Sequence, residues 1–357
     1  MKAKTKFHRI GLLLLTLLAV RAVVPAQDLS AKEKKEAVQA IAVAFETSYV
    51  YPDLGKKMAD LLRRKAAAGK YEAQAGGRDL AREITRDLFS ICADRHAVVA
   101  FMPERIQKQK DGDPKQLAAE ELQAARRDNF GIREARILEG NVGYLKLSSF
   151  HGSPEALDAA AAAMQFLGHS EALILDVRFN PGGNSAMVQF LASYFLEGEP
   201  VLLDEFHYRR DGRVNQLWSL PYVPGKKLAG TDLYILIDAY TFSAAEGLAY
   251  DLQALKKAVI TGEPSVGGAH AVENQTVLDS YLLFMPVAFS KNPVTGTNFQ
   301  GKGVQPDLRV SGKTALLKTH IHALEQLLKK SADQARKAEW KDVLKQLRQE
   351  LAALEAK

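Results

Sequence analysis

The sequence predicts an α/β core with helical segments before and after it. Near-continuous apolar runs, such as EALILDVRF (171–179) and DLYILID (232–238), are typical of strands that are buried on both faces. Segments of helical character, such as SAMVQFLASYFL (185–196), separate these strands. Strands that alternate with helices indicate a sheet whose faces are covered by helices. The fold class is therefore α/β.

The 357 residues divide into four segments: a signal peptide at 1–26, an N-terminal helical bundle domain at 27–130, an α/β core domain at 131–312 and a C-terminal helical extension at 313–357. Within the bundle, GRDLAREITRDLFSI places its apolar residues on one helical face. The polar segment PERIQKQKDGDPKQ (103–116) is expected to be an exposed loop. The C-terminal segment is expected to form two charged amphipathic packing helices, with His320 and His322 at the surface.

The first 26 residues have the features of a secretory signal peptide. The basic MKAKTKFHRI precedes the short apolar GLLLLTLLAV, and the small residues of VVPA predict cleavage after Ala26. The apolar part is short for a membrane span, although an uncleaved anchor remains the alternative. The sequence therefore predicts an exported protein, periplasmic or secreted, with no stable membrane span once the signal is removed.

Removing this segment changes the charge balance. The chain has 48 Lys and Arg against 42 Asp and Glu, a formal net charge of +6, and five of the basic residues lie in the signal. The remaining 43 basic and 42 acidic residues give no basic surface, so nucleic-acid binding is not expected. Cys92 is the only cysteine, so no intrachain disulfide can form. No histidine pair has metal-ligand spacing, and we expect neither a metal nor another cofactor.

Two predicted strand-to-helix turns carry residues suited to catalysis. In DVRFNPGGN (176–184), two glycines allow exposed N–H groups to approach a bound group, as an oxyanion site requires, although a plain tight turn would look the same. The second turn, IDAYTFSAAEG, contains Ser243. Ser243-Ala-Ala-Glu246 reads as a capping box. The same serine could be a nucleophile whose oxyanion is held by the amide of Ala244.

A serine nucleophile also needs a base, because its hydroxyl is unreactive at its own pKa. His96 follows a predicted helix in ADRHAVVAF, and His270 lies in the glycine loop SVGGAH. Spacing in a single sequence does not choose between these two histidines.

Four motifs, in order along the chain, resemble the serine peptidases of the C-terminal processing (tail-specific) family. They are LILDVRFNPGG, YILIDAYTFSAAE, VITGEPSVGGAH and NPVTGTNFQGKGVQPDLRV, and the resemblance covers residues 140–312. It is closest to the branch that includes the interphotoreceptor retinoid-binding protein repeats. The resemblance implies a ClpP/crotonase-like α/β core and the hydrolysis of peptide bonds in polypeptide substrates.

The resemblance also implies roles for individual residues. Ser243 matches the nucleophile, and His96 in DRH matches the general base. The amides of Gly182 or Gly183, together with that of Ala244, match the oxyanion hole. We expect further substrate contacts from Asn184, Gly267, Gly268 and His270.

The chain departs from the family at three points. Gly268 lies where the tail-specific subgroup has its lysine base, which excludes a Ser–Lys dyad in that place. The PDZ domain of that subgroup is missing. Gln300 stands where the branch usually has an acidic residue that orients the histidine, and Glu273 is a candidate replacement. A glutamine can accept the Nδ1–H bond but cannot stabilise an imidazolium by charge.

The sequence therefore predicts an exported serine endopeptidase that uses Ser243, His96 and Gln300, with activity weakened by Gln300. The alternative is a catalytically weak or inactive homologue that binds peptides or apolar ligands, such as retinoids or fatty acids. The natural substrate and the oligomeric state are not predicted.

Overall fold

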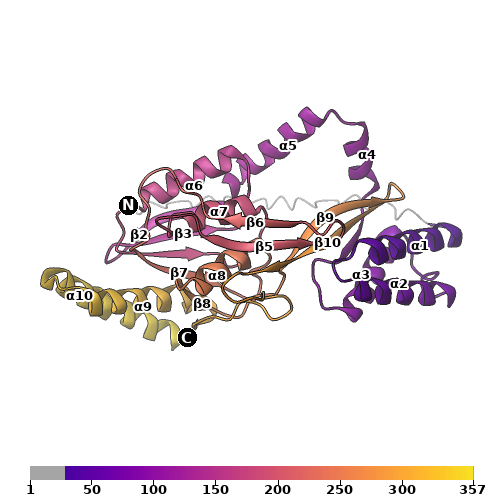
Figure 1. Ribbon diagram of the computed structural model, residues 1–357. Helices are drawn as coiled ribbons and strands as arrows, with labels where there is room; N and C mark the ends of the chain where they lie inside the picture. Colours follow the sequence, from indigo (N-terminus) through magenta and orange to yellow (C-terminus); the bar gives the residue numbers. More distant parts are fainter. Residues whose placement is uncertain (1–28, 357) are drawn as a thin grey trace, which may run out of the picture.

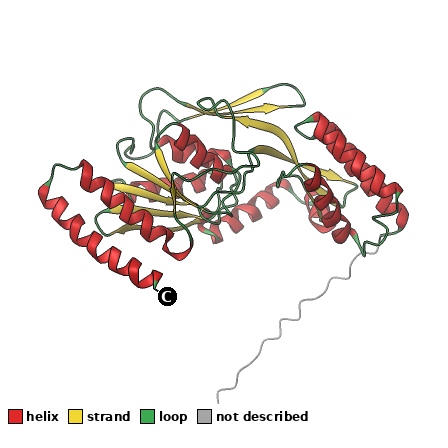
Figure 2. Cartoon of the chain, turned by 90° about the horizontal axis from the view of Figure 1, so that it is seen from below, coloured by secondary structure: helices red, strands yellow, loops and turns green. Residues whose placement is uncertain are grey.

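The computed structural model describes residues 29–356, so the signal peptide predicted for 1–26 lies outside the described residues. Two β-sheets occupy the centre of the structure, and helices lie at both ends (Figures 1 and 2). The predicted α/β class, with helices before and after the core, is confirmed.

The larger sheet has six strands in the order β11-β8-β7-β4-β3-β2. Its strands are β2 (Ile132–Leu138), β3 (Val142–Leu147), β4 (Ala172–Asp176), β7 (Asp232–Ile237), β8 (Ala258–Gly262) and β11 (Leu308–Arg309). All neighbours pair in parallel except the edge strand β2, which is antiparallel to β3. The chain leaves β4 and β7 at the same edge of this sheet, so the two turns singled out in the sequence lie side by side.

Helices cover both faces of the larger sheet, which explains its near-continuous apolar strands. Along β4, Leu173 and Leu175 pack with α6 (Pro154–Phe166), α7 (Ser185–Ser193) and α8 (Ala244–Ala254). The alternate residues Ala172 and Ile174 pack with α9 (Ala315–Lys330) and α10 (Gln334–Glu355) on the other face.

The smaller sheet has five strands and connects the core to the N-terminal helices. Its members are β1 (Val98–Phe101), β5 (Leu202–Tyr208), β6 (Val214–Trp218), β9 (His270–Val277) and β10 (Tyr281–Lys291). Alternate residues of β10 pack against α1 (Ala31–Ser48), α2 (Pro52–Ala67) and α3 (Gly77–Ile91). The strand β1 comes from the N-terminal segment and pairs with β10, so the two segments share one sheet.

The prediction of an exposed loop at 103–116 is wrong, because most of this segment is helical. It forms α4 (Pro103–Asp111) and the start of α5 (Pro114–Arg127), and a short 3-10 turn, η1 (Asn129–Gly131), follows. Each helix has a proline in its first turn, and Asp113 caps α5 by accepting a hydrogen bond from Lys115 N. Lys, Gln, Glu and Ala are good helix formers, but these helices bury only Ile106 and Ala125, so no apolar periodicity marks them.

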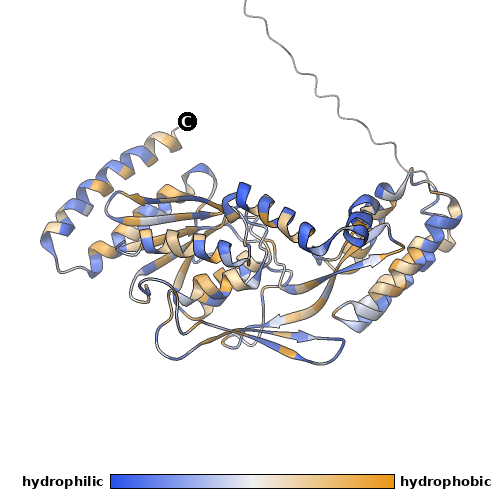
Figure 3. Cartoon of the chain, turned by 90° about the horizontal axis from the view of Figure 1, so that it is seen from above, coloured by the Kyte–Doolittle hydropathy of each residue, from blue (hydrophilic) through white to orange (hydrophobic). Residues whose placement is uncertain are grey.

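The C-terminal segment begins with the turn η2 (Gly312–Thr314) and forms the predicted helix pair, α9 and α10. Near the end marked C in Figure 3, hydrophilic and apolar residues alternate along α10. His320 is not at the surface: it is buried, and its Nε2 lies 2.8 Å from the Glu139 carbonyl oxygen. Within residues 29–356, no helix is both long and apolar enough to cross a membrane.

Candidate active site

Ser243 lies at the turn between β7 and α8, where its backbone adopts an unusual conformation. Its φ of 55° and ψ of −124° lie outside the extended region that an N-cap residue usually adopts. A non-glycine residue held in such a region costs about 1–3 kcal/mol and is common at functional sites. The turn is stabilised by Asp238, whose Oδ1 accepts hydrogen bonds from the amides of Phe179, Tyr240 and Thr241.

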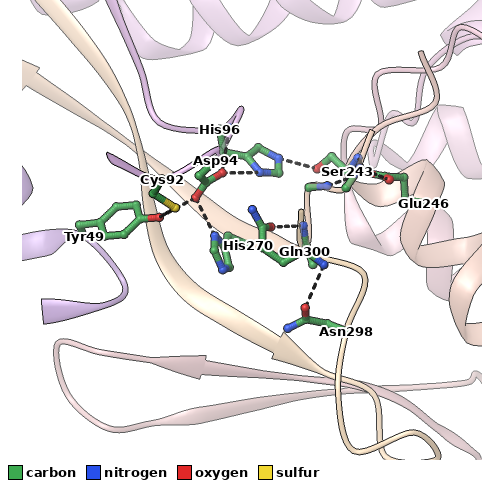
Figure 4. Close-up of polar contacts among 12 residues, drawn as sticks. Tyr49, Cys92, Asp94, His96, Ser243, Glu246, His270, Asn298 and Gln300 are labelled. Atoms are coloured by element: carbon green, nitrogen blue, oxygen red, sulfur yellow. Dashed lines mark hydrogen bonds and ion pairs between the residues drawn. The ribbon is translucent and has the colours of Figure 1, made fainter. Parts of the chain in front are cut away.

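His96 reaches Ser243 from the N-terminal segment, as Figure 4 shows. His96 lies in the loop between α3 and β1, and its Nε2 is 3.1 Å from Ser243 Oγ. The imidazole is 9% exposed and packs on Phe242, with 4.4 Å between ring centroids. The structure therefore brings together the serine and one of the two candidate histidines.

Asp94 is the carboxylate nearest to His96. Its Oδ1 accepts a hydrogen bond from His96 N at 3.0 Å and lies 3.7 Å from His96 Nδ1. Its Oδ2 lies 2.7 Å from His270 Nδ1 and accepts from the Tyr49 hydroxyl at 3.0 Å. Burial favours the neutral acid, but the hydrogen bonds and charges of His270 and His96 outweigh it and hold the pKa of Asp94 well below its usual range. Asp94 is therefore a buried carboxylate anion beside the imidazole.

Gln300 does not take the expected place behind the imidazole. Its Oε1 accepts a hydrogen bond from Ala269 N at 2.7 Å, and no hydrogen bond to His96 is found among the described residues. The buried Nδ1 of His96 has no partner within hydrogen-bond distance in residues 29–356. The alternative carboxylate, Glu273, lies on β9 and lines a different pocket. Gln300 instead orders the loop that carries Ala269 and His270.

Two of the three amides expected to form an oxyanion hole are available. Gly182 N donates to Asn180 Oδ1 at 2.8 Å and is therefore engaged. In residues 29–356 neither Gly183 N nor Ala244 N donates a hydrogen bond. Gly182 has φ 90°, and a Cβ there would lie 2.7 Å from Ala244 N, so only glycine lets this turn approach the serine turn.

A pocket of about 560 Å³ opens beside Ser243 and His96. Of the expected substrate contacts, Asn184, Gly268 and His270 line this pocket, whereas Gly267 does not. Asn184 also caps α7 by accepting from Ala186 N. The Nε2 of His270 lies 3.3 Å from the Tyr51 hydroxyl, so both of its ring nitrogens already have partners.

Gly268 marks the position at which the resembling subgroup has its lysine. A Cβ at Gly268 would lie 2.1 Å from Phe242 Cε2 and 2.7 Å from His96 Cε1. The space that a lysine side chain would need is thus filled by the histidine and its aromatic neighbour. The His96 imidazole therefore lies beside the serine, where the resemblance would lead one to expect the lysine.

Glu246 connects the serine turn to the glycine loop. Its Oε2 accepts from Ser243 N and Gly268 N, both at 2.8 Å. Its Oε1 accepts from Gly267 N at 2.6 Å and from Ser265 Oγ at 2.5 Å. Burial raises the pKa of Glu246, although these four bonds favour its anion. The predicted capping box therefore forms through Glu246, and the same carboxylate also fixes the loop beside His96.

Replacing Glu246 with glutamine should destabilise the protein and misplace the serine. The amide NH₂ would face an N–H donor at either oxygen position, which removes at least one buried hydrogen bond to a charged group. We expect the free energy of unfolding to fall by about 2–4 kcal/mol. Chemical denaturation of Glu246→Gln and of the exposed control Glu263→Gln measures this effect, and equal stability of the two would contradict it.

The sequence did not predict that Asp94 lies beside His96. It predicted the capping box of Glu246 with Ser243, but not the hydrogen bonds of Glu246 to residues 265–268. Asp94 precedes His96 by two residues, and an Asp at that spacing often accepts a hydrogen bond from the later amide. That local signal was present in ADRH. The contacts of Glu246 with residues 265–268 have no local signal, because they depend on the tertiary fold.

The α/β fold and this arrangement of serine, histidine and free amides are typical of hydrolytic enzymes. Residues 141–310, a little under half of the chain, match peptidase family S41, which confirms the resemblance seen in the four motifs. Membership of the interphotoreceptor branch stays a prediction.

Solved structures support the same fold. A lipoprotein from Streptococcus agalactiae is 14% identical, with a TM-score of 0.56 over 82% of this chain and 96% of that one. The photosystem II D1 C-terminal processing protease is 16% identical, with a TM-score of 0.51 over 79% of this chain and 94% of that one.

Proposed function

We propose that this protein is an exported serine endopeptidase, in which Ser243 is the nucleophile and His96 the general base. The observation that carries this proposal is the 3.1 Å distance between His96 Nε2 and Ser243 Oγ. It is supported by the family match and by the predicted signal peptide. A nucleophile and a base within hydrogen-bond reach are the minimum for covalent acyl transfer.

In the proposed reaction, Ser243 Oγ attacks the carbonyl carbon of the scissile peptide bond while His96 Nε2 takes the hydroxyl proton. The amides of Gly183 and Ala244 stabilise the oxyanion that forms. When the tetrahedral intermediate collapses, the C–N bond breaks and His96 returns the proton to the leaving amine. A water molecule then attacks the acyl-enzyme with His96 again as base, which releases the second product and restores the serine.

Asp94 is the positioning residue in this proposal, in place of Gln300. Its carboxylate lies 3.7 Å from His96 Nδ1 and stabilises the positive charge that develops when the imidazole takes a proton. Catalytic hydrogen bonds are often long without substrate and shorten when substrate binds. A small rotation of His96 would bring its Nδ1 within hydrogen-bond distance of Asp94, so the loss of the acid at position 300 need not abolish catalysis.

Labelling and cleavage of the same preparation test the proposed function. We expect a fluorophosphonate to form one adduct, which mass spectrometry locates on the peptide containing Ser243. We also expect the protein to generate new termini in an unstructured polypeptide, such as a reduced and carboxymethylated protein. A sample that has fully reacted with the probe should lose this cleavage. Neither labelling nor cleavage between pH 5 and 9 would refute the proposal.

Binding of an apolar ligand is the second candidate function. Val188, Phe206, Leu217, Phe284 and Phe299 give the pocket apolar walls. Two buried carboxylates, Asp204 and Asp251, also line this pocket and would repel the head group of a fatty acid. Displacement of a fluorescent fatty acid separates the two functions, because only the binding function predicts it.

A further inference from the structure

Two carboxylates line the active-site pocket away from the catalytic residues. Asp204 lies on β5 and is 5% exposed, and Asp251 lies on α8 and is 2% exposed. Both line the pocket that contains Ser243 and His96. The two carboxylates are close enough for the charge of Asp204 to raise the pKa of Asp251 further, beyond the effect of burial.

These carboxylates have no positive partner in residues 29–356, since no Lys, Arg or His forms an ion pair with either of them. Asp251 Oδ1 accepts from Asn292 Nδ2 at 2.9 Å, but Asp251 Oδ2 has no hydrogen-bond partner in the same part of the chain. The one hydrogen bond that the Asp204 carboxylate accepts in residues 29–356 comes from a neutral group, the amide of Glu205, to Oδ1 at 2.8 Å. A buried charge without a partner is costly, so a cation that enters the pocket would be bound favourably.

The pKa values of Asp204 and Asp251 agree with a site that binds a cation. Burial raises the pKa of Asp204 to about 7, and burial together with the charge of Asp204 raises the pKa of Asp251 well above its usual value. A bound cation would oppose both of these shifts, because it stabilises the carboxylate anions.

The geometry of α8 sets the distance from the nucleophile to this acidic pair. Ser243, Gly247 and Asp251 are spaced by four residues and lie along one side of the helix. A Cβ at Gly247 would meet no atom within 4 Å, so open space lies between the other two residues. The eight residue steps from Ser243 to Asp251 span about 12 Å along the helix, and the Asp251 side chain points back toward the N-terminus, which shortens this gap. A lysine or arginine side chain bridges a gap of this length.

The pocket walls suit the stem of such a side chain. Phe206, Leu217, Phe284 and Phe299 are apolar and can cover the methylene groups of lysine or arginine while the charged end meets the carboxylates. Two carboxylates alone are fewer than the ligands that metal sites use, and residues 29–356 contain no cluster of three side chains that could hold a metal. An organic cation therefore fits better than a metal ion.

We propose that Asp204 and Asp251 form the floor of a specificity pocket, and that the enzyme cleaves after lysine or arginine. This inference rests on the peptidase function proposed above, because it assigns the side chain on the acyl side of the bond that Ser243 attacks. A purely structural role for Asp251, as an anchor of Asn292, predicts no preference for cations.

The first arm of the test measures binding without turnover. Calorimetric titration of the whole protein with benzamidine should show binding, and uncharged benzyl alcohol should bind at least tenfold more weakly. Asp251→Asn and Asp204→Asn should each weaken benzamidine binding at least tenfold. The control Glu205→Gln should stay within twofold, because Glu205 is next in sequence but does not line the pocket. Equal binding of the two compounds by the wild-type protein would overturn the inference, even if both variants failed to fold.

The second arm measures specificity. Peptides that differ only at the residue before the scissile bond should be cleaved with a kcat/KM about 100-fold higher for arginine or lysine than for norleucine. In Asp251→Asn this ratio should fall below about tenfold, consistent with the loss of a charged partner in a buried site. Cleavage without preference for arginine and lysine would refute the inference and leave the peptidase function standing. Binding of benzamidine without any cleavage would refute the peptidase function and the cleavage preference with it, and would leave only a binding site for organic cations.

Discussion

Replacing Ser243 with alanine should lower kcat for polypeptide cleavage by about 10⁴-fold or more and abolish fluorophosphonate labelling. The hydroxyl oxygen forms the covalent bond to substrate, and no other described serine lies next to both His96 and the free amides of Gly183 and Ala244. Any residual rate would come from the remaining oxyanion donors and from substrate binding. Initial rates on an unstructured polypeptide and gel fluorescence of the labelled protein measure these effects.

The exposed Ser311 provides a matched control for this substitution. Ser311→Ala should keep both the rate and the labelling of the wild-type protein. Ser243→Ala should remain folded, because alanine removes only one hydroxyl. If Ser243→Ala retained wild-type cleavage, another residue would be the nucleophile and the proposed mechanism would fail.

Replacing Asp94 with asparagine should have the next largest effect, a fall in kcat of about 10²- to 10⁴-fold. In trypsin, the same substitution at the triad aspartate lowers kcat by about 10⁴-fold. The variant retains the shape of the side chain but loses the charge that stabilises protonated His96. The amide can also turn its NH₂ group toward the imidazole and favour the wrong tautomer. Steady-state kinetics on one peptide substrate measure the change.

A comparison of kcat with KM separates this positioning role from a structural one. In Asp94→Asn, kcat should fall while KM stays within about twofold, because Asp94 does not line the pocket that would hold substrate. A merely structural defect would change KM as well. Gln300→Ala is the decisive comparison, and it should cost less than about tenfold in kcat, because Gln300 holds a loop amide and not the imidazole. If kcat fell further in Gln300→Ala than in Asp94→Asn, we would conclude that Gln300, and not Asp94, orients His96.

Local patterns predicted most of the core. Buried strands such as β4 and β7 are continuous apolar runs, and the glycines and Ser243 at their ends mark the turns. The helices α4 and α5 were missed because they bury too few side chains to show apolar periodicity. Helix propensity and the cap at Asp113, which do not depend on burial, were the available signals.

The candidate catalytic residues were harder to predict than the core. The turn identified Ser243, but the choice between His96 and His270 depends on how β1 and β9 pair with β10. Family likeness pointed to Gln300, whereas the fold places Asp94 beside the imidazole. Asp204 and Asp251 looked like ordinary acidic residues, because only the tertiary fold places both of them in one pocket.

The pairing of β1 with β10 has a consequence for the order in which the candidate active site assembles. His96 and Ser243 are 147 residues apart in the chain, and the strand β1 that follows His96 pairs with β10, which lies beyond both residues in sequence. Synthesis proceeds from the N-terminus, so His96 emerges first, Ser243 later and β10 last. A growing chain that lacks β10 cannot hold the base against the serine. If Ser243 and His96 act as proposed, a growing chain therefore has no assembled nucleophile and base with which to attack itself before the shared sheet is complete.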